Sequence, residues 1–308
     1  MLRATPALAL LALALAGCDA IFGIESPEHA DAGPDTSNMV AVDAGSFTYS
    51  PIGHTATFTR GLWVDVDEVT VARFSAWVDA GQPPPCGGGA CSLDPGGPYE
   101  STMQWDPAWN DDVATKGYAS STDCHVAMSV TDAKPTWSAG DDRYPIVCVT
   151  WYQAEAFCAF EHKRLPTEAE WEYVATDGGT RTMQTYPWGD APPDCDHALW
   201  NDGAADGNGC HFPKPVGSTK SGGSALGVHD LGGSVFERTW DWFVDSLPSS
   251  MDVTDYTGPA KPAGADPSKA DRGGSWAAGE SYLRVTTRDG TEASGVFADV
   301  GLRCVATK

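Results

Sequence analysis

Apolar and polar residues alternate along two stretches of the chain. Residues 39–50, MVAVDAGSFTYS, and residues 56–70, ATFTRGLWVDVDEVT, place apolar side chains at roughly every second position. Side chains of a β-strand point in turn to its two faces, so this period is typical of strands with one buried face. The sequence therefore predicts half-buried strands in a folded region that begins near Met39.

Apolar residues recur at helical spacing further along the chain. Residues 70–81, TVARFSAWVDAG, predict a helix with Thr70 as its N-cap and Gly81 at its end. Residues 149–163, VTWYQAEAFCAFEHK, predict a second helix that Thr150 can cap. We expect one inward face on this helix, formed by Trp151, Ala154, Phe157, Cys158 and Phe160.

A third helix is predicted just after Pro166. Thr167 and Glu170 have the Thr-x-x-Glu spacing of a capping box, in which each side chain accepts a hydrogen bond from the other residue's backbone. From Tyr186 onward the chain is rich in loops, with short strands and no internal repeat.

Residues 82–144 follow neither period, and we interpret them as an ordered insertion, since an unstructured loop of this length is unusual in a compact domain. Cys86 and Cys91 could close its Pro- and Gly-rich loop, and Cys124 could pair with Cys148. The composition of the whole chain, with Gly 34, Pro 22 and Trp 12, agrees with many turns and irregular loops.

The N-terminus predicts export and lipidation. The apolar run from Ala7 to Ala16 is too short to span a bilayer and is typical of a signal sequence. It ends in Leu-Ala-Gly-Cys, which resembles a bacterial lipobox with Cys18 as the acylated residue; the alternative is an ordinary signal with a chance cysteine. We therefore expect a signal peptide at 1–17, a lipidated tether at 18–38 that binds the membrane, and a domain at 39–308 in the bacterial cell envelope, facing the periplasm or the cell exterior.

The net charge and the cysteine content limit which partners and metals are expected. The formal net charge is −23, so the chain repels phosphate backbones and nucleic acid is not expected as a partner. Eight cysteines follow Cys18, and an even number in an exported chain favours disulfides. Zinc is the weaker alternative, because the sequence contains no Cys-x-x-Cys motif.

The segment KRLPTEAEWEYVA, residues 163–175, resembles the signature of the formylglycine-generating enzyme, or sulfatase-modifying factor, superfamily. Other segments match in the family's order: MVAVDAGSF, VDVDEVTVARFSAWV, YPIVCVTWYQAEAFC, YPWGD, VGS, GVHDLGGSVFERTWDWF, RGGSW and GLRC. The resemblance covers 39–308 apart from the insertion. It implies an irregular C-type-lectin-like α+β domain with little regular secondary structure.

The resemblance also implies one disulfide pair directly. Cys158 matches the family cysteine that pairs with the one in the terminal Gly-x-Arg-Cys motif, here Cys304. Cys195 and Cys210 flank a loop of Asn, Asp and Gly and are expected to pair locally. With Cys86–Cys91 and Cys124–Cys148, these pairs would leave no spare thiol after Cys18.

The resemblance implies bound calcium. The expected ligands are the side chains of Asp230 and Glu237 and the carbonyls of Gly233 and Val235, since Ca²⁺ takes oxygen ligands. The alternative is that both acids are solvated loop residues. In a second family site the ligating Asn falls at Ala198, and an oxygen site rebuilt from Asp202, Asp206 and Asn208 competes with their use as turn residues.

The copper chemistry of the family is not expected in this chain. The resemblance places two copper-binding cysteines after Gly273-Gly274-Ser275, at positions that hold Ala278 and Leu283 here. Soft thiolates suit Cu(I), and neither of these side chains can bind a metal. A related branch uses iron and a His-x3-His-x-Glu pattern, which is also absent from the sequence.

The sequence thus favours a non-catalytic lipoprotein that binds an unknown protein, peptide or small molecule. Five residues are expected to line the cleft that corresponds to the active site of the family: Trp276, Glu280, Tyr282, Arg284 and Arg288. The alternative for these residues is that the aromatic rings are core and the arginines pair with nearby acids. The alternative for the function is an enzyme of altered oxidative chemistry that acts on exported peptides or small molecules.

Overall fold

The structure is a computed structural model that describes residues 33–115, 124, 136, 140–181, 183–204, 209–247 and 252–308. The chain separates into two units, and every element named below belongs to the second, Pro34–Lys308. The residues expected to form the signal peptide, the lipidated Cys18 and most of the tether lie outside the described residues.

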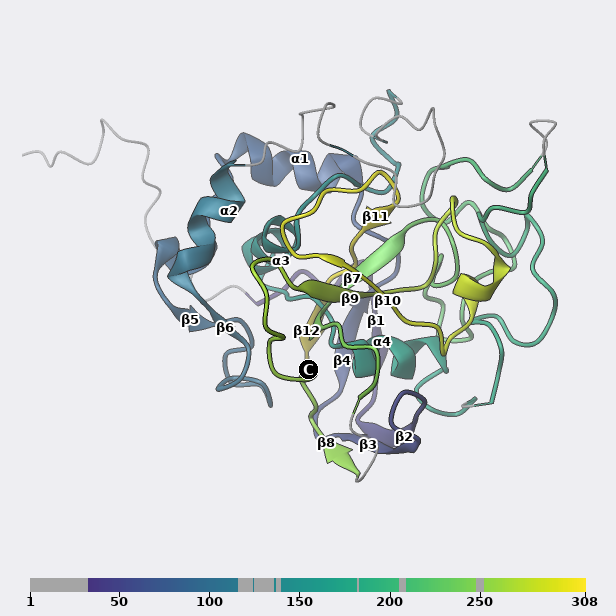
Figure 1. Cartoon of the computed structure of the whole chain (residues 1–308), viewed down its shortest axis with the longest axis horizontal. Helices are drawn as coiled ribbons and strands as arrows, with labels where there is room; N and C mark the ends of the chain where they lie inside the picture. Colours follow the sequence, from purple (N-terminus) through teal and green to yellow (C-terminus); the bar gives the residue numbers. More distant parts are fainter. Residues whose placement is uncertain are drawn as a thin grey trace, which may run out of the picture. The chain divides into compact units, whose positions relative to one another are not determined.

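Four strands open the fold, as the alternating pattern predicts. They are β1 (Met39–Val42), β2 (Gly45–Tyr49), β3 (His54–Phe58) and β4 (Leu62–Asp65). In β2 the side chains of Phe47 and Tyr49 are buried, whereas Ser46 and Thr48 are exposed. β4 pairs with β1 on one side and with the C-terminal β12 (Val305–Thr307) on the other (Figure 1). β3 pairs in the same way with β2 and with β8 (Val253–Thr254).

The three predicted helices are confirmed, together with their caps. They are α1 (Val71–Asp79), α3 (Trp151–Phe160) and α4 (Glu168–Ala175). Thr150 and Thr167 each form a full capping box, and Thr70 caps α1 by accepting a hydrogen bond from the Arg73 backbone. The single inward face predicted for α3 is wrong, because the helix is buried on all sides from Trp151 to Cys158, and Phe160, predicted to be inward, is 40% exposed at its end.

A four-stranded sheet carries the longest strand of the described chain. It has the order β10-β9-β7-β11, with β7 (Phe236–Trp242), β9 (Ser268–Arg272), β10 (Asp289–Glu292) and β11 (Val300–Gly301) (Figure 1). The side chains of β7 from Phe236 to Asp241 are all buried, so this strand has no solvent face. Such a strand does not alternate in the sequence.

Residues 82–144 contain short elements where no period is visible in the sequence. They are η3 (Pro85–Gly88), β5 (Cys91–Ser92), β6 (Gln104–Trp105), η4 (Pro107–Trp109) and α2 (Asn110–Thr115). The rings of Trp105 and Trp151 each meet the Trp109 ring edge to face, and their centroids lie 5.3 and 5.4 Å from the Trp109 centroid. Aromatic packing therefore joins this segment to the core at α3.

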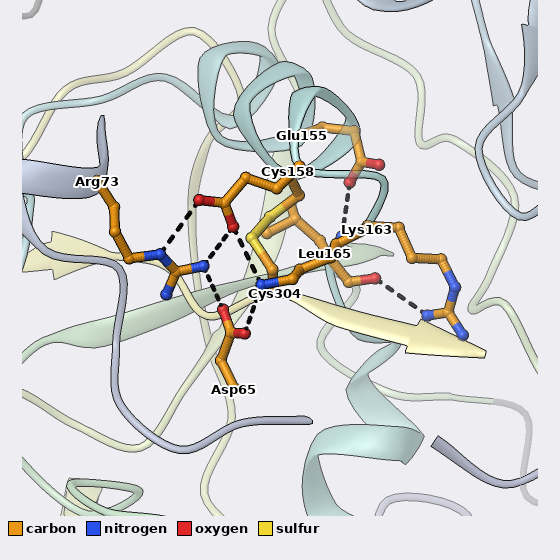
Figure 2. The surroundings of a disulfide bond; sticks show 9 residues. Asp65, Arg73, Glu155, Cys158, Lys163, Leu165 and Cys304 are labelled. Carbon is orange, nitrogen blue, oxygen red and sulfur yellow. Dashed lines mark hydrogen bonds and ion pairs between the residues drawn. A yellow bond between two sulfur atoms is a disulfide. The ribbon is translucent and has the colours of Figure 1, made fainter. Parts of the chain in front are cut away.

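All four predicted disulfides are formed: Cys86–Cys91, Cys124–Cys148, Cys158–Cys304 and Cys195–Cys210. Figure 2 shows the third bridge between α3 and the C-terminal segment, with Asp65 nearby. Asp65 accepts from Arg73 at 2.8 Å and from Lys163 at 2.9 Å. The bridge fastens the end of the chain to α3, and the ion pairs join β4 to α1 and to the residues that follow α3.

The observed architecture is the mixed α and β fold with little regular structure that the resemblance implies. In the part of the chain that the structure describes, no helix is long and apolar enough to cross a membrane.

Candidate functional site

The segment after β9, which holds the two positions that the resemblance assigns to copper thiols, begins with a turn. Gly273 and Gly274 have φ of 91° and 79°, in the left-handed region that favours glycine. A Cβ on Gly274 would lie 3.0 Å from the backbone of Tyr282, so the chain folds closely back on itself here. The reversal ends in a 3₁₀ helix, η6 (Glu280–Leu283).

The two positions expected to hold copper thiols in the family are part of the apolar core. Ala278 and Leu283 are both fully buried. Ala278 packs with Phe236 and Val300, and Leu283 packs with Tyr186 and Ala198. Apart from the Tyr186 hydroxyl, which donates to Glu280, the side chains of these four neighbours are apolar.

Two of the five predicted cleft residues have partners within the fold. Trp276 is 3% exposed and packs with Val147, Cys148 and Val235. The Arg288 guanidinium is held by the Glu168 carboxylate and by the Val244 carbonyl at 2.9 Å. These contacts favour the alternative for both residues, in which Trp276 is core and Arg288 pairs with an acid.

The other three predicted cleft residues are accessible to different degrees. Glu280 and Arg284 are exposed, and Tyr282 is half-buried, with its ring edge-on to Phe236. The Tyr186 hydroxyl donates to Glu280 at 2.6 Å, and the Arg284 guanidinium lies 5.9 Å from the centre of the Tyr186 ring. Burial, with the Glu280 carboxylate, raises the pKa of Tyr186 to about 12.

Trp188 extends this group. Its ring stacks on Tyr186 with the planes 6° apart and the centroids 4.9 Å apart. We call Trp188, Glu280 and Arg284, with the buried Tyr186 ring behind them, the η6 surface. It combines the half-buried Trp188 ring with one acidic and one basic group. Nothing in the sequence alone marks Tyr186 and Trp188 as site residues, although both belong to the YPWGD motif.

Asp230, a predicted calcium ligand, is buried and organises its own loop. Its carboxylate accepts from the Thr219 hydroxyl at 2.7 Å and from the Gly217 backbone at 2.5 Å. Its φ of 57° and the φ of 87° at Gly233 turn the loop sharply before β7 begins. A Cβ on Gly233 would lie 2.4 Å from the Leu199 carbonyl oxygen, so only glycine fits here.

Glu237, the second predicted carboxylate ligand, already has partners. Arg303 donates to it at 2.7 Å and the Trp171 indole at 2.9 Å, all within the core. Arg303 also donates to the carbonyls of Asp65, Val66 and His229. Glu237 is thus a buried ion-pair partner and not the solvated loop acid of the alternative reading.

Glu68 is a third acid in this cluster, and no motif in the sequence marks it as a site residue. Its carboxylate accepts from the Ser234 hydroxyl at 3.0 Å and from the Val235 backbone at 3.2 Å. Complete burial, with the nearby charges of Asp230 and Glu237, raises the pKa of Glu68 well above its usual range. These three buried carboxylates lie near the Arg303 guanidinium, but among the described residues their oxygens do not come close enough together to share one ion. A cation here would need the carbonyls of Gly233 and Val235 as ligands.

The second predicted calcium site is not supported by its described residue. Asp202 accepts from the backbones of Ala204 and Cys210 and contacts His211, so it acts as a turn residue. Asp206 and Asn208 lie outside the described residues. Asp202 also lies close to the sulfurs of Cys195 and Cys210, but these form a disulfide.

Comparison with known families identifies the fold. A model of the sulfatase-modifying factor enzyme 1-like domain matches residues 25–308. The chain belongs to this family.

Within the family, several relatives align with part of the chain. Hercynine oxygenase of Mycolicibacterium thermoresistibile is 37% identical over 152 residues, which are 47% of this chain and 32% of the relative. Inactive C-alpha-formylglycine-generating enzyme 2 of Mus musculus is 32% identical over 53% of this chain and 49% of the relative. Formylglycine-generating enzyme of Streptomyces coelicolor is 32% identical over 54% of this chain and 53% of the relative. The chain spans about a third to a half of the length of these relatives.

Solved structures share the fold. Treponema denticola variable protein 1 superposes with a TM-score of 0.58 at 20% identity, covering 88% of this chain and 95% of that protein. PvdO from Pseudomonas aeruginosa superposes with a TM-score of 0.56 at 21% identity, covering 88% of this chain and 94% of that protein. At this level of identity the similarity concerns the fold alone.

Proposed function

We propose that this family member is a non-catalytic lipoprotein that binds a protein, peptide or small-molecule ligand. One observation carries the proposal: the two positions that the family resemblance assigns to copper thiolates are occupied by the buried Ala278 and Leu283. A methyl group and an isobutyl group in an apolar core can neither bind Cu(I) nor transfer electrons.

The cysteine pairing supports the same function. The eight cysteines after Cys18 form four disulfides, so none of them offers a thiolate. A metal-binding or nucleophilic cysteine must be a thiolate. A relative that is 32% identical over about half of the chain is named as inactive, which agrees with loss of catalysis within this family.

The η6 surface is the proposed ligand-binding surface. The Trp188 ring, stacked on the buried Tyr186, provides rigid contact area, and the exposed Arg284 and Glu280 provide directed hydrogen bonds. Glu280 lies between the two altered thiol positions in the sequence, and Arg284 directly follows the second of them. In this proposal the protein retains the location of the family site and uses it for binding alone.

Calcium is the proposed structural ion. Asp230 and the carbonyls of Gly233 and Val235 would hold it, and Glu68 faces the same cluster as a further carboxylate. Glu237 is the other carboxylate of the proposed site. Its two oxygens accept hydrogen bonds from Arg303 and Trp171, just as those of Asp230 and Glu68 accept from their own donors, so the ion would share each of these acceptors. A bound cation would offset the excess of buried negative charge.

An altered oxidative enzyme is the second candidate, favoured by the alignment with hercynine oxygenase at 37% identity. Metal analysis of the purified full chain, combined with O₂ uptake in the presence of a cysteine-containing peptide, separates the two functions. We expect stoichiometric calcium, a lower melting temperature after chelation with EGTA, and no O₂ uptake. Bound copper or iron together with O₂ consumption would show that the chain is an enzyme.

The control for this experiment is the double variant Ala278→Cys/Leu283→Cys. If it gains copper binding that the natural chain lacks, the two side chains are the cause of the lost metal site. If neither protein binds copper, other residues have also changed. If EGTA leaves the melting temperature unchanged, the calcium proposal fails while the binding function stands.

Lipidation of Cys18 is proposed to anchor the protein in the cell envelope. We expect the natural chain in the membrane fraction and Cys18→Ala in the soluble fraction, because acyl chains supply the membrane affinity. Cys86→Ala/Cys91→Ala is the matched control and should stay with the membrane. A Cys18→Ala variant that remains membrane-bound would rule out the lipid anchor.

A further inference from the structure

The Cys86–Cys91 disulfide is the most accessible of the four bridges. Cys86 is exposed and Cys91 is half-buried. Each of the other three bridges contains at least one buried cysteine, namely Cys148, Cys210, or the pair Cys158 and Cys304. Thiol–disulfide exchange begins when a thiolate attacks one sulfur of a bridge, so its rate depends on access to that sulfur. Access therefore favours attack at Cys86–Cys91.

Local charge distinguishes this bridge from Cys195–Cys210, in which Cys195 is also exposed. The Asp202 carboxylate lies within 4.8 Å of both sulfurs of Cys195–Cys210. A carboxylate repels an approaching thiolate and disfavours the thiolate that leaves. Among the described residues, no carboxylate lies in this way against both sulfurs of Cys86–Cys91. Cys86–Cys91 therefore lacks this electrostatic protection.

The loop between the two cysteines has a strained backbone. Cys86 has a φ of 57°, in the left-handed region that is unfavourable for a residue with a Cβ, and Gly87 and Gly88 follow with φ of 62° and 87°. Such a conformation persists only where the surrounding structure holds it. Here it is held by the bridge and by the Asn110 amide, which donates to the Gly88 carbonyl at 2.8 Å. Opening of the bridge would let the backbone of Cys86 relax.

Contacts on both sides of the loop would hold the rest of the fold in place if the bridge opened. Before the loop, the Trp77 indole donates to the Pro83 carbonyl at 3.2 Å. After the loop, Cys91 pairs with Trp105 across β5 and β6. The bridge spans a sequence separation of 5, against 15, 24 and 146 for the other three bridges. Because the stabilisation by a disulfide grows with the length of the loop that it closes, reduction of this bridge would destabilise the fold least.

We propose that Cys86–Cys91 is a thiol–disulfide exchange site that accepts electrons from a dithiol. A thiolate of the dithiol attacks the Cys86 sulfur, the bond between the two cysteines breaks, and Cys91 leaves as a thiolate that takes up a proton. The second thiolate of the dithiol then attacks the dithiol's own sulfur in the mixed disulfide and releases Cys86, which is protonated in turn. The bridge gains two electrons and two protons, and the dithiol becomes a disulfide.

This exchange site is independent of the proposed binding function. Cys86 and Cys91 belong neither to the η6 surface nor to the proposed calcium ligands. Reduction would supply two thiols within residues 82–144 and would leave Ala278 and Leu283 unchanged at the positions assigned to copper. Failure of this inference would therefore leave the proposed function untouched.

Reduction of the purified full chain under native conditions tests the proposal. The chain is incubated with increasing dithiothreitol, free thiols are alkylated with iodoacetamide, and peptide mass spectrometry measures the labelling of each cysteine. We expect Cys86 and Cys91 to be labelled at a dithiothreitol concentration at least about tenfold below that for the other three pairs, while the circular dichroism spectrum stays native. Oxidised glutathione should then restore the bridge. Earlier labelling of another pair, or labelling of Cys86 and Cys91 only when the chain unfolds, would overturn the proposal.

Single variants test which sulfur is attacked. Cys91→Ser leaves the exposed Cys86 as a free thiol, and Cys86→Ser leaves the half-buried Cys91. With dithionitrobenzoate as the probe, we expect the Cys86 thiol to react at least about tenfold faster than the Cys91 thiol. Cys210→Ser is the matched control, because it frees the exposed Cys195 beside Asp202, and its thiol should react more slowly than that of Cys86. Equal rates at Cys86 and Cys91, or a faster reaction at Cys195, would overturn the assignment of Cys86 as the attacked sulfur.

Discussion

Asp241 shows how a single buried acid can control the stability of this protein. It lies on β7, where its Oδ2 accepts from the Glu168 backbone at 2.8 Å and its Oδ1 has no partner among the described residues. Burial, together with the charge of Glu168, raises the pKa of Asp241 to about 8. Burial also raises the pKa of Glu155 and of Asp271 to about 7.

These raised pKa values make stability depend on pH. Between the unfolded pKa of about 4 and the folded value of about 7 to 8, the folded state holds protons that the unfolded state releases. The free energy of unfolding therefore falls as pH rises through this range and levels off above it. Each such proton contributes a slope of up to about 1.4 kcal/mol per pH unit.

We predict that Asp241→Asn flattens this dependence. The amide can still accept from the Glu168 backbone, but it cannot ionise. The free energy of unfolding of the variant should therefore fall less steeply with pH, by the contribution of about one proton. Denaturant unfolding measured from about pH 5 to about pH 8 checks this. The exposed Glu100→Gln serves as control and should keep the natural slope. An unchanged slope in Asp241→Asn would mean that Asp241 titrates normally in the folded protein.

At the scale of elements, helices were the part of the fold that the sequence predicted well. Their signals are local: a threonine cap, a glutamate or glutamine three positions later, and apolar residues at helical spacing. Thr150 and Thr167 form the expected capping boxes. The burial of α3 was harder to predict, because a helix surrounded by other elements has no polar face to mark its orientation.

The candidate site was predicted less completely, because it depends on contacts between distant residues. The turn at Gly273 and Gly274 and the helix η6 follow from left-handed backbone and close packing against Tyr282, not from an apolar period. Glu68 meets Ser234 and Val235 across more than 160 residues of sequence, at separations of 166 and 167. No local pattern in the sequence could assign Glu68 to that cluster.

At the scale of the whole molecule, the C-terminal segment joins elements from the start and the middle of the chain. β12 pairs with β4, and Arg303 donates to the carbonyls of Asp65 and Val66. Cys304, next to Arg303, is bonded to Cys158 on α3 across a sequence separation of 146. The family resemblance supplied this pairing, whereas an even cysteine count alone left several pairings open.

The sequence separations of the disulfides lead to a prediction about their relative strength. In the chain-entropy model a bridge stabilises the fold by restricting the unfolded chain, and its effect grows with the logarithm of the loop length. A loop of 146 residues corresponds to about 5 kcal/mol and a loop of 5 residues to about 2 kcal/mol. Cys158→Ala/Cys304→Ala should therefore lower the free energy of unfolding more than Cys86→Ala/Cys91→Ala.

Packing should widen this difference. Cys158 and Cys304 are fully buried, so removal of their sulfurs also leaves a small cavity, whereas Cys86 is exposed. Denaturant unfolding of the two double variants, with the midpoint and slope fitted separately, measures the effect. Equal losses in both variants would show that restriction of the unfolded chain does not determine the stabilisation.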